Sequence, residues 1–319
     1  MEHQLIANAE SRDVIDMGAI FSTIWKSKIL VGVTTLIFSI TGIAYSLSTP
    51  NIYKSSVLLA PAKEKRGDLA SIAGQFGGLA SLAGINIGTG DTDQIVIAKE
   101  TLESRKFIAE FIKRHEIASI IYAATSWDEE KKEWNFDPEL YDVETQKWKF
   151  DDEGETFKPS DWDLVKDFKE DHFRVSEDKN TGLITISIKS YSPIEAKMWA
   201  EWIVNDINEY IREKDVKEAE RSIKYLEEKL EETTISGMQK IFYQLIEAET
   251  RTVMLANARE EYIFKTIDPA VVPEEKAEPK RAIICLIAAF LGFLIGIVIA
   301  LIKNLIQRNK TIPENIQCN

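Results

Sequence analysis

Two stretches of about twenty residues without a charged side chain lie near opposite ends of this 319-residue chain. The first is Ile29–Leu47 and the second is Ala282–Ile302. About 20 apolar residues in a helix, rising 1.5 Å each, span the ~30 Å hydrocarbon layer of a bilayer. We therefore predict transmembrane helices over residues 29–48 and 282–302, which place both termini on the same side of the membrane.

A cleaved signal peptide is the alternative for the first stretch. However, 28 residues precede it, four of them acidic, and no small-x-small cleavage pattern follows Leu47. The second stretch is closed by Lys303, Arg308 and Lys310, which is typical of a membrane helix rather than of a buried core helix. These flanks favour a membrane anchor at each end.

Residues 49–281 form one long block between the two anchors. They carry 33 basic and 47 acidic residues, a net charge of −14, which disfavours nucleic acid as a partner. The cations that flank the two anchors nearly balance, so the positive-inside rule does not choose an orientation. Because long loops translocate largely regardless of charge, we expect the block to be periplasmic. Residues 1–28 and 303–319 would then be cytoplasmic.

The block mixes strand patterns with helical patterns. Strands are predicted at Asn51–Ala60, Phe173–Ser176, Leu183–Lys189 and Tyr262–Ile267, and amphipathic helices are predicted within Gln94–Ile117. The expected class is α+β. Residues 49–192 and 262–281 would form an α/β base, and residues 193–261 would form long helices.

The sequence SPIE at 192–195 is a helix start signal, with an N-cap serine, proline at the first position and glutamate at the third. No Gly or Pro follows until Gly237, so residues 193–234 predict a rod of roughly 60 Å. A second helical stretch follows at Met238–Tyr262. The two predict either a helical hairpin or one kinked rod.

Both helical stretches carry apolar residues at the 3-4-3-4 spacing of a coiled coil. On the first they are Val216, Ala219, Ile223, Leu226 and Leu230, and on the second Ile241, Leu245, Ala248, Thr252 and Leu255. A helix this long cannot bury such a stripe within its own base, so the stripe faces the returning helix or another subunit. We therefore predict a hairpin or oligomer seam, and a homo-oligomer.

Two segments of the block have an unusual composition. Residues 67–90 are Gly-rich with an apolar helical stripe, and are either a flexible loop or a segment that packs on a neighbouring chain or the membrane. Residues 126–169 interleave four Trp with acidic residues, which is typical of an irregular aromatic core. Stacking on sugar rings is the functional alternative for the second segment.

The approach to the second anchor is punctuated by Pro269, Pro273 and Pro279, which predict a stiff extended connector. Within the anchor, Gly292 and Gly296 form a GxxxG pair, a motif that lets a neighbouring helix approach closely.

Motifs for catalysis are missing from the sequence. His3, His115 and His172 belong to no HExxH motif, and there is no phosphate loop, GxGxxG turn or nucleophile elbow. Among 52 acidic residues, a pair of carboxylates suited to glycoside chemistry is expected by chance. We predict a protein without catalytic residues, metal or cofactor.

The order of these features resembles the bacterial polysaccharide co-polymerases, or chain-length determinant (Wzz) family. The resemblance covers nearly the whole chain. It is carried by NIYKSSVLLAP after the first anchor, GQFGGLASLAG at 74–84, the block at 181–208, and IDPAVVPEEKAEPKRA at 267–282. Members with a cytoplasmic tyrosine-kinase domain continue into a phosphate loop, and the sequence resembles the kinase-free branch.

The resemblance implies a ring-like homo-oligomer in the bacterial inner membrane. Such a ring would act as a scaffold that controls how many repeat units a membrane polymerase adds to a lipid-linked glycan, of O-antigen, capsule or exopolysaccharide. Control would act through contacts with the polymerase or with the glycan, and the sequence leaves both open. No catalysis is implied.

Two other classes compete. A two-span sensor needs a cytoplasmic output module, which residues 303–319 are too short to form. A periplasmic adaptor of an export system shares the long hairpin, but commonly has one anchor and a β-rich lipoyl-type domain.

Overall fold

The computed structural model describes residues 25, 27–62 and 90–310, which fall into two compact units. The first unit joins residues 1–50 to residues 278–319, and the second comprises residues 51–277. The Gly-rich segment predicted at 67–90 lies outside the described residues except for its last glycine. Each unit has its own internal packing.

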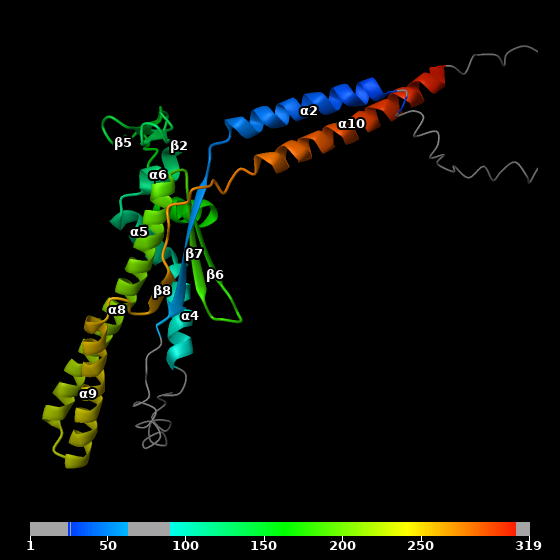
Figure 1. The fold of residues 1–319 in the computed structure, drawn as a ribbon. Coiled ribbons are helices and arrows are strands. Elements are labelled where there is room, and N and C mark those ends of the chain that lie inside the picture. Colours follow the sequence, from blue (N-terminus) through cyan, green and yellow to red (C-terminus); the bar gives the residue numbers. More distant parts are fainter. Residues whose placement is uncertain (1–24, 26, 63–89, 311–319) are drawn as a thin grey trace, which may run out of the picture. The chain divides into compact units, whose positions relative to one another are not determined.

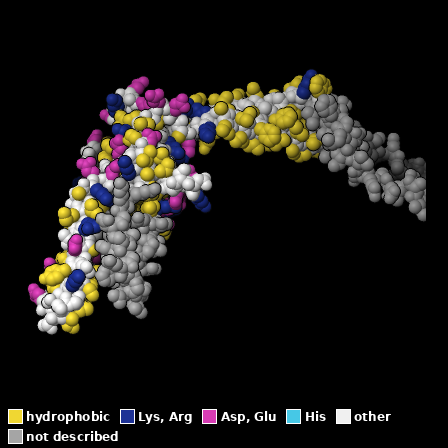
Figure 2. All heavy atoms as spheres, turned by 60° about the horizontal axis from the view of Figure 1, so that its bottom comes forward, with side chains coloured by type: hydrophobic (Ala, Val, Ile, Leu, Met, Phe, Trp, Pro, Cys, Tyr) yellow, Lys and Arg dark blue, Asp and Glu magenta, His cyan; other side chains and the backbone are white. Residues whose placement is uncertain are grey.

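The first unit contains two long apolar helices, α2 (Lys28–Ser48) and α10 (Arg281–Lys310). Lys28–Ser48 and Arg281–Asn304 are long and apolar enough to cross a membrane. Figure 2 shows mainly hydrophobic side chains along both helices, whereas charged side chains concentrate over the other unit. Side chains that are apolar yet exposed suit a lipid environment.

The helix α10 continues past residue 302, where the predicted anchor ends, to Lys310. The apolar run stops there, but the following residues are mostly good helix formers and include no Gly or Pro. The first part of the predicted cytoplasmic tail is therefore a continuation of the helix. Residues 311–319 lie outside the described residues.

The second unit is built on an antiparallel sheet in the order β6-β7-β1-β8. Its strands are β6 (Phe173–Glu177), β7 (Ile184–Ser190), β1 (Tyr53–Pro61) and β8 (Phe264–Asp268). The predicted strands are thus confirmed. Alternate side chains of β1 and β7 point into the core, because side chains of a strand alternate between its two faces. Val57 pairs with Ile186, and Leu59 with Ile184, all four of them buried.

The long helix α8 (Pro193–Glu232) begins where SPIE predicts, with the Ser192 hydroxyl accepting a bond from Glu195 N at 3.3 Å. Its first half covers the sheet with fully buried Trp199, Ile203 and Ile207. Its second half leaves the sheet, as Figure 1 shows.

The helix α9 (Ser236–Ala258) returns along the outer half of α8, so the structure is a hairpin and not a kinked rod. The turn consists of residues 233–235, where Thr233 N bonds the Leu230 carbonyl at 3.3 Å. Gly237 therefore lies in the first turn of α9 and does not make the break. Together the sheet, the base and this hairpin confirm the α+β class.

Short helices complete the base: α4 (Gly90–Leu102), α5 (Arg105–Arg114), α6 (Ala118–Ala123), α7 (Asp161–Asp167) and the π-helical turn η1 (Phe168–His172). The amphipathic pattern of α5 is confirmed, since Phe107, Ile108, Phe111 and Ile112 are buried. On α4, Leu102 is buried as an amphipathic helix requires, whereas Ile97 is 48% exposed and Ala98 is buried in its place.

The Trp-rich segment folds into two small hairpins. One pairs β2 (Ala124–Asp128) with β3 (Glu133–Phe136), and the other pairs β4 (Tyr141–Asp142) with β5 (Lys147–Trp148). Trp127 packs edge-on to Trp134 at 5.1 Å between ring centroids, and Tyr141 packs on Trp148 at 5.3 Å. These rings serve as local packing for chain that has little regular structure.

Candidate functional site

Among the described residues, His, Cys, Asp and Glu side chains form no group of three that could hold a metal ion. Three structural features instead connect the elements that the sequence singles out: the contact between α2 and α10, the proline-punctuated connector, and the helical hairpin with its root.

The predicted GxxxG pair lies against the chain's own helix α2. A Cβ atom on Gly292 would lie 2.6 Å from Phe38 Cβ, and one on Gly296 would lie 3.0 Å from Val31 Cα. Gly42, which the sequence analysis does not single out, faces Ala288 in the same way. The three contacts follow each other antiparallel along the helices. Any side chain at these positions would push the two helices apart.

The connector between β8 and α10 is fastened to the start of β1. The Ser55 hydroxyl donates to the Val271 carbonyl at 2.8 Å, and Ala277 N donates to the Ile52 carbonyl at 2.8 Å. Pro269 and Pro273 lie in this stretch, where proline fixes φ and supplies no donor. Because Ile52 and Ala277 lead toward α2 and α10, these bonds hold together the two ends of the second unit.

The hairpin seam on α8 faces α9. Ala219 is 1% exposed, and Val216, Ile223, Leu226 and Leu230 are partly buried. On α9 the predicted stripe is wrong at Ile241, Leu245 and Ala248, which are exposed, but Thr252 and Leu255 are partly buried as predicted. Other shielded positions of this helix are Phe242, Ile246, Glu249, Val253 and Ala256. Met238, Ile241 and Leu245 are 42%, 42% and 43% exposed, so α9 is apolar on two faces.

Within the shielded face of α9, Glu249 is a polar exception. Burial raises the pKa of its carboxyl, and the nearby Glu218 of α8 raises it further. The charge of Glu218, which is exposed, repels a charge on Glu249 and disfavours its ionised form.

The root of the hairpin is held by Asn208. Its Oδ1 accepts bonds from Ile263 N at 2.8 Å and Phe264 N at 2.9 Å, and its Nδ2 donates to the carbonyls of Phe264 and Val204 at 3.1 Å. Every hydrogen-bonding group of this buried amide is thereby satisfied. No sequence pattern marks Asn208, because Ile263 and Phe264 are 55 and 56 positions away along the chain.

A second polar cluster joins α8 to α5. Buried Asp206 accepts from Arg114 Nη1 at 3.1 Å and lies 3.0 Å from His115 Nε2. The His115 ring stacks on Trp202 with centroids 4.2 Å apart. The Asp206 carboxylate is buried, and its pairing with the Arg114 guanidinium offsets the cost of burying its charge. His115 is thus part of the packing between helices.

The other described histidine, His172, is also structural. Its Nδ1 donates to the Lys189 carbonyl at 2.8 Å, and its ring packs beside Phe168 and Trp199. Burial lowers the pKa of His172. The base therefore holds this imidazole neutral.

Two rings of the aromatic segment face outward. Phe150 is 67% exposed, and Trp162 is 60% exposed with the Arg105 guanidinium 5.0 Å from its ring centroid.

Tyr53 links β1 to the first small hairpin through a hydrogen bond from its hydroxyl to Glu129. This bond, together with burial, raises the pKa of Tyr53 to about 12.

The described residues thus combine two helices long and apolar enough to cross a membrane with an α/β base and a helical hairpin. Residues 13–115 match the family model described as "Chain length determinant protein" (Wzz). Residues 235–305 match a second model, GNVR, described as "G-rich domain on putative tyrosine kinase". The chain therefore carries a chain length determinant domain, as its resemblance predicts.

Two solved structures are similar to the chain. One is titled "full-length bacterial polysaccharide co-polymerase", with 13% identity, a TM-score of 0.39, and coverage of 96% of this chain and 100% of that one. The other is a fragment of WzzB, a polysaccharide co-polymerase from Salmonella Typhimurium, with 12% identity, a TM-score of 0.33, and coverage of 72% and 100%. No curated protein gives a significant match. Both TM-scores lie below 0.5, so the assignment rests on the two family models.

Proposed function

We propose that this chain is an inner-membrane scaffold that regulates the chain length of a bacterial surface polysaccharide, in O-antigen, capsule or exopolysaccharide synthesis. The match of residues 13–115 to the chain length determinant model is the observation that carries the proposal. That stretch runs from before α2, through β1, to the end of α5, so it includes the membrane anchor and part of the base.

The proposal places both termini in the cytoplasm and residues 49–281 in the periplasm. Copies of the chain assemble into a ring that acts beside the membrane polymerase and its lipid-linked glycan. The ring biases when polymerisation stops and makes or breaks no bond itself. The connector bonds at Ile52 and Ala277 support this reading, since they suit transmission between the periplasmic base and the membrane.

The second candidate is a periplasmic adaptor of an export system, which the α8–α9 hairpin favours. One experiment separates the two. The gene is deleted, then restored, and the surface polysaccharide is resolved on a gel. The proposal expects a changed length distribution that the restored gene corrects. Unchanged polysaccharide together with lost secretion of another cargo would favour the adaptor.

A further inference from the structure

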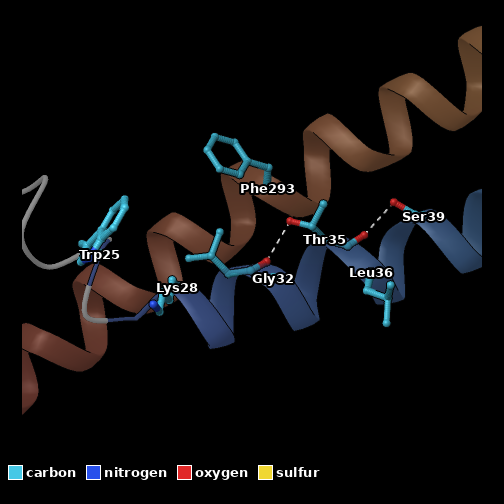
Figure 3. A pocket seen from close by; sticks show the side chains of 8 residues that line it. Trp25, Lys28, Gly32, Thr35, Leu36, Ser39 and Phe293 are labelled. Atoms are coloured by element: carbon cyan, nitrogen blue, oxygen red, sulfur yellow. Dashed lines mark hydrogen bonds between the residues drawn. The ribbon is translucent and has the colours of Figure 1, made fainter.

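A groove of about 460 Å³ runs along one face of α2. Figure 3 shows its lining residues, which include Lys28, Gly32, Thr35 and Ser39 of α2, and Trp25 just before this helix. Phe293 of α10 contributes a ring to the wall. All of these lining residues belong to the first unit, which contains α2 and α10.

The floor of the groove presents a hydrocarbon-like surface despite its hydroxyl groups. Thr35 Oγ1 donates to the Val31 carbonyl at 2.8 Å, and Ser39 Oγ donates to the Thr35 carbonyl at 2.8 Å. Their protons are therefore used within the helix itself and do not call for a polar ligand. At Gly32 the surface is open, because a Cβ atom there would meet nothing within 4 Å.

One end of the groove is cationic and aromatic. Lys28 Nζ lies 5.7 Å from the centroid of the Trp25 ring, and the Trp25 side chain is 66% exposed. Trp rings concentrate at the headgroup level of a bilayer, and a lysine at a helix end extends its ammonium toward that level. From Lys28 to Ser39 the helix rises about 16 Å, about half of the hydrocarbon layer. The polar end thus lies at headgroup depth and the apolar remainder at acyl-chain depth.

We propose that this groove binds one anionic phospholipid of the surrounding bilayer, with its phosphate on Lys28 and an acyl chain along Gly32. Charge complementarity selects the occupant. A cation at headgroup depth above an apolar floor fits a negatively charged amphiphile better than a zwitterionic lipid or another apolar helix. The inference requires that α2 spans the membrane and does not depend on the proposed control of chain length.

Trp25 supplies a direct probe, because the other six tryptophans, of seven in all, lie in the second unit. The full-length protein is reconstituted into nanodiscs that contain brominated phosphatidylglycerol or brominated phosphatidylcholine at equal mole fraction. Quenching of Trp25 is obtained by subtracting the signal of W25F. We expect phosphatidylglycerol to associate about fivefold more strongly, the preference that one lysine near the membrane surface supplies.

Two substitutions and a control locate the binding. Lys28→Gln should reduce the fivefold preference to about one. Gly32→Leu fills the open floor at a position where an added Cβ atom meets nothing within 4 Å, so it should lower quenching by brominated phosphatidylglycerol severalfold. Val33→Leu adds volume to an exposed residue of the same helix that does not line the groove. It should change neither the preference for phosphatidylglycerol nor the quenching by its brominated form.

Equal quenching by the two lipids in the unaltered protein would overturn the proposal, as would a preference that survives Lys28→Gln. Unbrominated lipids added as competitors test the identity of the occupant. Phosphatidylglycerol should restore Trp25 fluorescence at least as well as an isoprenoid phosphate at the same mole fraction. Stronger competition by the isoprenoid phosphate would overturn the phospholipid assignment.

Discussion

Asn208 binds the main chain of Phe264 at both its N–H and its C=O. The amide oxygen accepts from Phe264 N at 2.9 Å, and the amide nitrogen donates to the Phe264 carbonyl at 3.1 Å. The two residues are 56 positions apart, one in the long helix and one in the edge strand β8. This contact holds β8, which follows the hairpin, against α8, the first helix of the hairpin.

Replacing Asn208 with Ala should destabilise the protein strongly. The change leaves the buried N–H groups of Ile263 and Phe264 and the Phe264 carbonyl without that partner, and each unsatisfied group costs about 1–3 kcal/mol. We expect Tm of the full-length protein in detergent to fall by about 5 °C or more. Asn257→Ala is the matched control, since its amide bonds only the Val253 carbonyl on an exposed part of α9. Equal shifts for the two variants would contradict this role.

The two faces of α9 should respond differently to charge. Ile223→Asp with Leu226→Asp places charges in the seam between α8 and α9, where an unpaired charge costs several kcal/mol. Tm should fall. Ile241→Asp with Leu245→Asp alters the outer face and should leave Tm nearly unchanged.

Oligomer mass in detergent, measured on the same two double variants, shows whether a second copy binds either face. A loss of mass from the outer variant alone would place a subunit contact on that face. If Ile223→Asp with Leu226→Asp changes neither Tm nor the oligomer mass, these residues lie neither in the core of the hairpin nor in an interface between subunits.

The loss of stability as the pH is lowered should depend on His172. Because burial lowers its pKa in the folded state, protonation favours the unfolded state, whose histidine has a pKa of about 6.5. The stabilising contribution is therefore complete above pH 6.5 and is lost as the pH falls below it. His172→Asn keeps a donor near the Lys189 carbonyl without the titrating ring. Between pH 7.5 and pH 5, Tm of this variant should decline less than Tm of the unaltered protein. Equal declines would show that protonation of His172 does not cause the loss of stability.

Much of the architecture could be predicted because its signals are local. The charge-free runs, the SPIE cap and the alternation of Ile184, Ile186 and Ile188 each lie within one element. The outcome at α9 shows the limit of such signals. Its sequence contains two overlapping apolar stripes one residue apart, and only the packing against α8 decides which residues of each stripe are shielded.

The polar contacts that α8 makes with distant segments could not be predicted from the sequence for a different reason. Asp206 and Arg114 are separated by 92 residues, and Asn208 looks like any helical asparagine until β8 lies beside it. The partner of Gly292 and Gly296 was likewise undetermined, since GxxxG suits any close neighbour. The structure supplies α2 of the same chain.

Topology can be tested with single cysteines. Ser176 is exposed on β6, so Ser176→Cys in a background with Cys285→Ala and Cys318→Ala should react with an impermeant thiol reagent on intact spheroplasts. The native Cys318, kept alone through Cys285→Ala, should react only after lysis. Protection of Ser176→Cys on intact spheroplasts would contradict a periplasmic block.

The central claim is that the chain controls polysaccharide length as a scaffold, and the length distribution on a gel tests it most directly. Cells that lack the gene would express the unaltered chain, variants of the connector or helix contact, or amide variants of single exposed carboxylates. Pro269→Gly with Pro273→Gly should shift the modal length by loosening the connector. Gly292→Leu with Gly296→Leu should shift it by separating the membrane helices. The amide variants should leave it unchanged. A single amide substitution that abolishes length control, with neutral results at the prolines and glycines, would contradict the scaffold and indicate an enzyme.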